Sequence, residues 1–368
     1  MAWIATYLVG SSYVLILYSD QARGYSCEVF FAFLCYYFLE IYLEKRKLGA
    51  AFLFGFGAAM GLLSHTAFLA FFAATLPWVA WRLFQLRSTP ARIIADLLLC
   101  YAVPSLLFAA LYLADIRHMG ILGGTPTTVF DGYSTALAYA FPPIAQGTDT
   151  IAMFIIVVAG LAAGGWVLWR ERSDSLIFFA GAIVVFPLGL VILGSSLLYV
   201  RYFIIGIAFG LVLLSIFLAW LWPRRRVLCA ALLLAYAIAN GRCILILFND
   251  GQGNYSEAVR ILTQQTRRPI ITVGGDQDFR IGVVLQFYCG QLPGNREVLY
   301  YPMGNWPQGG PEWVIYQKES YELPVPRRAV IGDGQHNHYA LVKIIPAAPL
   351  SAQHWFIYHN VREMTNDE

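Results

Sequence analysis

The segment Tyr18-Ser19-Asp20-Gln21-Ala22-Arg23-Gly24-Tyr25 combines residue types that can bind an anionic headgroup at a membrane edge. The planar guanidinium of Arg23 suits phosphate oxygens, and a site at that depth leaves the tail of a lipid in the bilayer. Asp20 and Tyr25 flank the arginine. Interfacial anchoring is the simpler interpretation, because tyrosine favours the headgroup level and arginine binds any lipid phosphate there. Residue type alone leaves both interpretations open.

Four further residues at the ends of apolar runs could contribute to the same chemistry: Glu28, His65, Arg201 and Tyr202. Glu28 is an ionisable group near a membrane, and thus either a functional acid or a headgroup-level carboxylate beside Arg23. His65, in a Ser-His-Thr turn, could bond a phosphate or an acceptor hydroxyl, or could only cap the backbone. Arg201 and Tyr202 could contact a phosphate or simply anchor a helix end.

The elements that position these residues must lie in a membrane. Of 368 residues, 58% are hydrophobic and 13% are charged, whereas soluble domains carry about 45–50% apolar and about 25% charged residues. This composition excludes a soluble globular enzyme, a disordered chain and a secreted disulfide scaffold. The net charge of +3 gives no argument for a nucleic-acid partner. We expect a polytopic α-helical membrane protein whose first partner is the lipid bilayer.

Apolar runs long enough to cross a membrane dominate residues 1–248. A span needs about 20 mostly apolar residues. The sequence predicts about nine transmembrane helices, at 2–18, 26–43, 49–64, 66–84, 94–114, 151–169, 175–195, 202–222 and 227–248. Residues 249–368 have the composition of a soluble domain, so we expect two domains, 1–248 and 249–368.

Lysine and arginine concentrate in alternate loops, at 45–47, 82–92, 170–172 and 224–226. Short basic loops stay cytoplasmic, so these loops and the N-terminus are expected inside. The segment 18–25, His65, the 115–150 loop, the 199–202 segment and the C-terminal domain are then expected outside. The predicted protein is therefore multi-pass, with a C-terminal extracytoplasmic domain.

The C-terminal region alternates predicted helices and strands. Helices are expected at 255–266 and, after Gly274-Gly275-Asp276, through about 288, and strands at 269–273, 297–301, 313–317 and 339–345. This alternation favours a small three-layer α/β domain. His336 and His338 with Asp333, and His354 with His359, do not match a zinc-ligand spacing, so no metal site is predicted.

An ordered set of motifs carries a resemblance to a known family. Tyr18, Ser19, Ala22, Arg23 and Tyr25 match a Y-S-Q-E-A-R-x-Y signature, with Asp20-Gln21 in place of Gln-Glu. The Ser64-His65-Thr66 turn resembles an L-T-H-Y-T turn, and the segment from Tyr199 to Tyr202 resembles an R-Y element. An α/β domain follows the last span. In these features the chain resembles GT-C membrane glycosyltransferases, which include protein O-mannosyltransferases and the aminoarabinose transferase of lipid A.

The resemblance implies an inverting glycosyltransferase in the cytoplasmic membrane of a bacterium. Its donor is a sugar on a polyprenyl phosphate, and its acceptor is a lipid, glycan or protein hydroxyl. It assigns donor and phosphate binding to Arg23, Tyr25, Asp20, His65, Arg201 and Tyr202, makes Glu28 a possible second acid, and fixes no cofactor or metal. The family's catalytic aspartate lies in a loop that would precede Met1. We therefore expect this chain to hold the donor-binding half of an active site and to lack the base.

Two other classes of function remain alternatives. The chain could be a non-enzymatic transporter, flippase or binding protein for a lipid-linked glycan, but transporters tend to carry polar groups and broken helices near mid-membrane. The predicted spans are nearly free of ionisable groups at their centres. A polyprenyl-dependent polymerase or ligase ranks third, since such enzymes usually have a very large outer loop between late spans.

Overall fold

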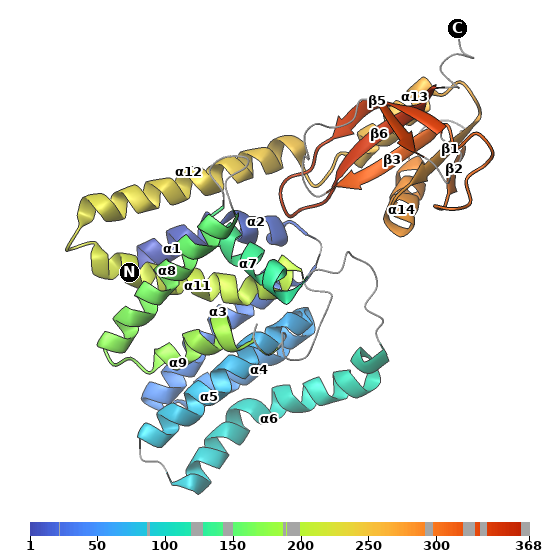
Figure 1. Ribbon diagram of the computed structural model, residues 1–368. Coiled ribbons are helices and arrows are strands. Elements are labelled where there is room, and N and C mark those ends of the chain that lie inside the picture. The colour runs from blue at the N-terminus through green and yellow to red at the C-terminus, as the bar shows by residue number, and fades with distance from the viewer. Residues whose placement is uncertain are drawn as a thin grey trace. The chain divides into compact units, whose positions relative to one another are not determined.

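The computed structural model describes residues 1–21, 23–86, 89–118, 128–142, 150–186, 189, 199–290, 297–318, 328–331 and 337–361. The chain divides into two compact units, Met1–Arg242 and Cys243–Glu368. The first is helical and the second contains a β-sheet (Figure 1).

The described residues of the first unit are mostly helical. Its helices α3 and α4 lie side by side (Figure 1). The α-helices are α1 (Ala2–Gly10), α2 (Tyr13–Ser19), α3 (Tyr25–Lys45), α4 (Leu48–Ser64), α5 (Leu69–Gln85), α6 (Pro90–Ala114), α7 (Val129–Ala140), α8 (Thr150–Arg170), α9 (Ser175–Ala180), α11 (Ile204–Leu221) and α12 (Arg226–Asp250). Single turns precede or follow several of them: η1 (Thr66–Phe68), η2 (Ile116–His118), η3 (Gly181–Val185) and η4 (Val200–Phe203).

The described residues contain six helices long and apolar enough to cross a membrane, or seven if the bent pair α1 and α2 counts as one span. The chain is therefore a multi-pass membrane protein. The described residues contain fewer than the nine expected spans for three reasons. The 2–18 run is broken, the helix at 49–64 has only 17 residues, and the helix that begins at Ser175 is described only to 186, and at 189.

The first apolar run bends by 57° between α1 and α2. Two polar side chains of α12 satisfy main-chain groups at this break. The Tyr236 hydroxyl donates to the Leu8 carbonyl at 2.6 Å, and Asn240 Oδ1 accepts from the Tyr13 N–H at 2.7 Å. Since the hydrocarbon core supplies no water, a broken span requires such partners from neighbouring helices.

The second unit is a mixed sheet with two helices, α13 (Tyr255–Gln265) and α14 (Asp278–Cys289). Six strands pair in the order β2-β1-β3-β6-β5-β4. They are β1 (Ile270–Gly275), β2 (Glu297–Tyr301), β3 (Trp313–Lys318), β4 (Arg328–Ile331), β5 (Asn337–Ile345) and β6 (His354–Asn360). The predicted α/β character and the four predicted strands are confirmed, whereas β4 and β6 were not predicted.

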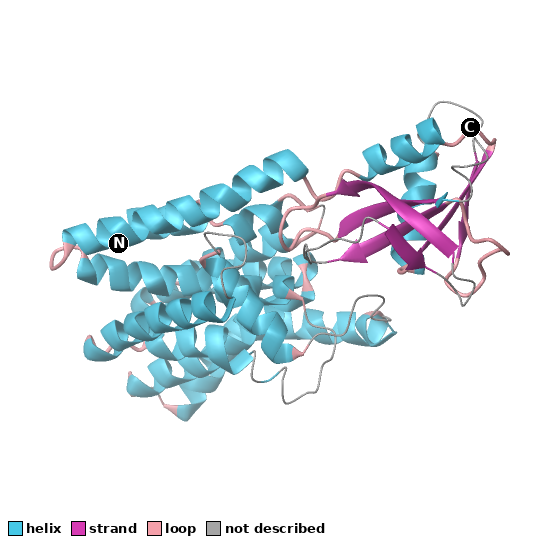
Figure 2. Ribbon diagram, turned by 45° about the horizontal axis from the view of Figure 1, so that its top comes forward, coloured by secondary structure: helices cyan, strands magenta, loops and turns pink. Residues whose placement is uncertain are grey.

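The predicted three layers are wrong for the described residues, because both helices cover the same face of the sheet. Ala258 of α13 and Ile281 of α14 share one buried cluster with Trp313 and Ile315 of β3. A right-handed helical crossover from β2 to β3 would cover the other face, but the connection 302–312 contains no helix. Figure 2 shows the continuous sheet and its helices.

Candidate functional site

Gly24 brings the first motif into contact with the histidine turn. Its backbone lies so close to Ser64 that an added Cβ would stand 1.9 Å from the Ser64 carbonyl oxygen. The φ and ψ of Gly24 are −70° and 11°, which other residues also adopt, so the close approach itself requires glycine. The segment that carries Arg23 is therefore fixed against the turn that carries His65.

Aromatic rings from three separate segments continue this contact. The Tyr18 and Tyr25 rings lie 5.6 Å apart, and the Tyr25 and His65 rings lie 4.8 Å apart. The His65 ring stacks on Tyr202 at 6.3 Å. These separations fall within the range of favourable aromatic pairs. We call Tyr18, Tyr25, Glu28, His65, Tyr199, Arg201 and Tyr202 the aromatic–arginine cluster.

His65 has the capping role, one of the two roles that its position allows. Its Nδ1 accepts the Ala67 N–H at 3.1 Å, so the ring caps the turn that follows. With Nδ1 occupied as an acceptor, the proton of the neutral ring is assigned to Nε2, which is then a hydrogen-bond donor. Capping therefore does not exclude anion binding by His65, and it fixes the tautomer that such binding requires.

Glu28 lies beside this histidine and is fully buried. One of its carboxyl oxygens, Oε2, is 3.3 Å from His65 Nδ1. Neither oxygen has a hydrogen-bond partner within the described parts of the chain. Because Nδ1 already accepts from Ala67, it cannot also donate to Glu28 in the neutral ring. Glu28 is therefore placed to influence the orientation and charge of His65 rather than to contact a substrate directly.

Arg201 supplies the positive charge of the cluster. Its guanidinium carbon lies 4.3 Å from the ring centroid of Tyr199 and 5.5 Å from that of Tyr202. Its Nε is buried and has no hydrogen-bond partner among the residues the structure describes. A buried donor without a partner costs about 1–3 kcal/mol, which a bound anion would recover.

The structure brings four of the predicted residues together with Arg201. Glu28, His65, Tyr25 and Tyr202 are linked by the contacts above. Arg23 and Asp20 are exposed at the end of α2. Across the described ranges, no ion pair or ring contact joins Arg23 to the cluster. Neither Tyr18 nor Tyr199 was predicted as a site residue. Their signal is their place in the motifs, two residues before Asp20 and two residues before Arg201, respectively.

The polar residues of the C-terminal unit form no metal centre within the described ranges. His354 Nδ1 accepts the Ala347 N–H at 3.0 Å, and His359 Nε2 lies 3.5 Å from Glu312 Oε1. His338 is exposed on β5. Asp333 and His336 lie outside the described residues.

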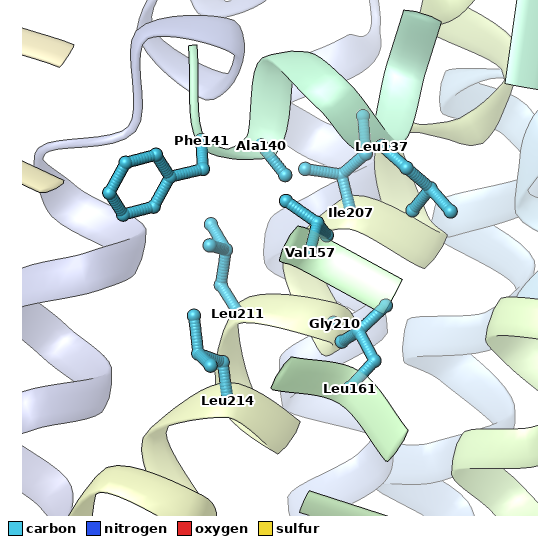
Figure 3. Close-up of a pocket in the computed structure, with 9 residues that line it drawn as sticks. All are labelled: Leu137, Ala140, Phe141, Val157, Leu161, Ile207, Gly210, Leu211 and Leu214. Atoms are coloured by element: carbon cyan, nitrogen blue, oxygen red, sulfur yellow. The ribbon is translucent and has the colours of Figure 1, made fainter. Parts of the chain in front are cut away.

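An apolar pocket lies between α7, α8 and α11 of the first unit (Figure 3). Its lining offers hydrocarbon contacts and no side-chain hydrogen bonds. The lining residues are Leu137, Ala140, Phe141, Val157, Leu161, Ile207, Gly210, Leu211 and Leu214.

No family model matches the sequence, and no curated protein matches it. The basis for a function is therefore the chain's own residues, and first among them the aromatic–arginine cluster, which contains most of the predicted site residues.

Proposed function

We propose that the aromatic–arginine cluster binds the phosphate of a polyprenyl-phosphate-linked sugar. The chain would be the donor-binding part of a glycosyltransferase that moves this sugar to a lipid, glycan or protein hydroxyl. The supporting observation is the buried Nε of Arg201, which has no partner in the described residues while two tyrosine rings flank its guanidinium. A fixed arginine at a helix end is suited to a lipid phosphate.

The chemistry would be displacement at the anomeric carbon of the sugar. The polyprenyl phosphate leaves with the electrons of the broken C–O bond, and the growing negative charge needs fixed hydrogen-bond donors. Arg201 and the Nε2–H of His65 would supply these donors, with Arg23 at the edge of the site. Glu28 would position His65 through their 3.3 Å contact.

The acceptor hydroxyl must also lose a proton to a base. The resemblance gives this role to an aspartate that has no matching position in residues 1–368. Glu28, fully buried beside His65, is a weak candidate for the base because it has no exposed surface for an acceptor. We therefore assign donor binding to this chain and assign acceptor activation to none of its residues.

The proposed setting is the cytoplasmic membrane of a bacterium, with the N-terminus inside and the cluster and C-terminal unit outside. Its support is the concentration of lysine and arginine in alternate loops. Cysteines placed singly at Ser64 and at Arg225 test this orientation in a chain whose six free cysteines, which include the exposed Cys27, are replaced by serine. A membrane-impermeant maleimide added to intact cells should label only the first.

Phosphate binding is tested with the full chain in nanodiscs and polyprenyl phosphate as the probe. Arg201→Ala should weaken binding by about 10-fold or more, since a hydrogen bond to a charged group contributes about 1.5–3 kcal/mol. Arg224→Ala is the matched control, because Arg224 lies 4.1 Å from the Trp220 ring near the opposite end of the same helix, α11. Equal binding by both variants would contradict the proposal.

Sugar transfer is tested separately, with polyprenyl-phosphate-linked radiolabelled mannose, glucose or arabinose added to membranes that contain the chain. The proposal expects release of polyprenyl phosphate and label in an acceptor fraction, with a large loss in Arg201→Ala but not in Arg224→Ala. Phosphate binding without transfer from any of these donors would restrict the chain to lipid binding.

One observation favours the transporter alternative, namely the break between α1 and α2. Broken spans build binding sites in many transporters. At this break the Ser12 hydroxyl is buried without a partner in the described residues. Its surroundings are the neutral side chains of Tyr236 and Asn240, so this function ranks second. Movement of a fluorescent polyprenyl-phosphate sugar across proteoliposomes, without its cleavage, would favour it.

A further inference from the structure

The sheet of the C-terminal unit contains a topological switch point. Strand β1 pairs in parallel with β2 on one side and with β3 on the other. The chain therefore leaves β1 toward one edge of the sheet and later returns to the opposite side of β1. In open α/β sheets, ligands bind beyond the carboxyl ends of the strands at such a point.

Polar residues follow the carboxyl ends of the two strands that define this point. Asp276 comes directly after β1, and Gln317 is the penultimate residue of β3. Both carboxyl oxygens of Asp276 accept the main-chain N–H of Gln317, at 3.1 and 3.2 Å. The two strand ends are thereby joined through the carboxyl group of Asp276.

The burial of the Gln317 side-chain amide is not explained by the stability of the fold. It is 7% exposed, and neither its Nε2 nor its Oε1 has a hydrogen-bond partner in the described residues. It shares the helix-covered face of β3 with Trp313 and Ile315, since side chains alternate along a strand. A buried amide left without partners costs about 1–3 kcal/mol for each unsatisfied group.

The first turn of α14 adds a second carboxylate on the same face. Asp278 Oδ1 accepts the Tyr300 hydroxyl at 2.8 Å and the Met303 N–H at 2.9 Å. Tyr300 packs against the same buried cluster as Ile315. Burial raises the pKa of Asp276 to about 6; the nearby Asp278 charge also raises it, whereas hydrogen bonds to its carboxyl group and Lys318 lower it.

We propose that the carboxyl ends of β1 and β3 form a binding site for a neutral saccharide, whose hydroxyl groups are read by the Gln317 amide and the Asp276 carboxyl group. A sugar hydroxyl both donates and accepts, so it can satisfy the amide oxygen and the amide N–H groups. The inference stands apart from the proposed sugar transfer, because saccharide binding by this unit requires no activity of the membrane unit.

The charges of the site set the class of ligand. Asp276 and Asp278 repel phosphate and carboxylate groups, and Lys318 offsets them only in part. A neutral sugar avoids this repulsion. A site built to hydrogen-bond a hydroxyl also rejects analogues that lack it, because its own buried polar groups are then left unpaired.

The test uses the full chain in nanodiscs, which avoids sugar-based detergents. Fluorescent neutral oligosaccharides of mannose, glucose, galactose and arabinose are the probes, and mannose 6-phosphate is the charged competitor. At least one neutral probe should bind. Gln317→Leu should weaken this binding by about 10-fold, and Asp276→Asn provides a second variant that keeps an acceptor for the Gln317 N–H.

Gln264→Leu is the matched control, because Gln264 is an exposed glutamine on α13. Hydrogen exchange of β1 and β3 verifies that each variant keeps the fold. The proposal is overturned if no neutral probe binds, if Gln264→Leu loses as much affinity as Gln317→Leu, if mannose 6-phosphate binds more tightly than mannose, or if a chelator abolishes binding.

Discussion

Replacing Gly24 by alanine is expected to separate the two segments that build the aromatic–arginine cluster. The new Cβ would stand 1.9 Å from the Ser64 carbonyl oxygen and 2.6 Å from its carbonyl carbon. Real Cβ atoms essentially never approach another heavy atom within 3.0 Å. Both obstructing atoms belong to the main chain, so no side-chain rotation relieves the overlap, and the segments must move apart by about 1 Å.

The size of the effect follows from this displacement. Overpacking of this kind costs about 1–3 kcal/mol. If the cost is paid by opening the contact, the population of the closed arrangement falls by roughly 5- to 150-fold. Turnover in a transfer assay is expected to fall about 100-fold, since catalysis is sensitive to a shift of about 1 Å. Alanine adopts the φ of −70° at this position, so backbone strain adds nothing.

Hydrogen exchange of the full chain in nanodiscs measures the opening directly. Peptides that cover 18–28 and 61–68 should both exchange faster in Gly24→Ala, and polyprenyl phosphate should bind more weakly. Gly49→Ala is the control, because an added Cβ there meets no atom within 4 Å. If both peptides exchange in Gly24→Ala at the rates of Gly49→Ala, the close approach does not hold the cluster together.

Three further outcomes follow from described contacts. Asn240→Leu removes the acceptor of the Tyr13 N–H. Hydrogen exchange of that amide should become roughly 5- to 150-fold faster, because an unsatisfied buried donor costs about 1–3 kcal/mol. An unchanged exchange rate would contradict the pairing. The pKa of Asp276 is raised to about 6 in the folded chain, so this group favours folding below about pH 4 and loses that contribution as pH rises through 6. After allowance for solvent screening, the free energy of unfolding of Asp276→Asn should therefore exceed that of wild type by about 1–2 kcal/mol at pH 8. The two should be equal near pH 4. Thermal unfolding at both pH values measures this difference. Glu312→Ala breaks a buried network and should lower the free energy of unfolding by about 3–5 kcal/mol. Glu257→Ala, at a partly exposed ion pair, should lower it by about 1 kcal/mol or less. Equal losses in the same unfolding assay would refute this difference between buried and exposed ion pairs.

Apolar runs locate the membrane helices well, but they do not reveal a break. The run 2–18 contains Gly10-Ser11-Ser12, and membrane helices also tolerate these residues without a break. The decisive partner, Asn240, is distant in sequence and becomes visible only in the fold. The same limit applies to the C-terminal unit, where all seven residues of β6 are buried and the alternation that marks a half-exposed strand is absent.

For the candidate site, the sequence identifies residue types at helix ends but not their pairings. The Glu28–His65 contact and the Gly24–Ser64 approach join segments about 40 residues apart through the packing of α3 on α4. The hydrophobic periodicity of a sequence does not reveal contacts between residues so far apart along the chain. Tyr18 and Tyr199 lie inside the motifs, yet their contacts with Tyr25 and Arg201 depend on ring geometry that only the folded chain defines.

The break between α1 and α2 also has a consequence for how the protein is made. Its acceptor Asn240 follows Tyr13 by 227 residues. A ribosome that adds about 5–20 residues per second needs roughly 10–45 s to synthesise that stretch. Until α12 emerges, the Tyr13 N–H and the Leu8 carbonyl lack these partners, and hydrocarbon strongly disfavours both groups. The segment Ala2–Ser19 must therefore remain in a hydrated environment, such as the insertion machinery or the lipid interface, until α12 is made. Its final burial comes after later helices have already entered the bilayer.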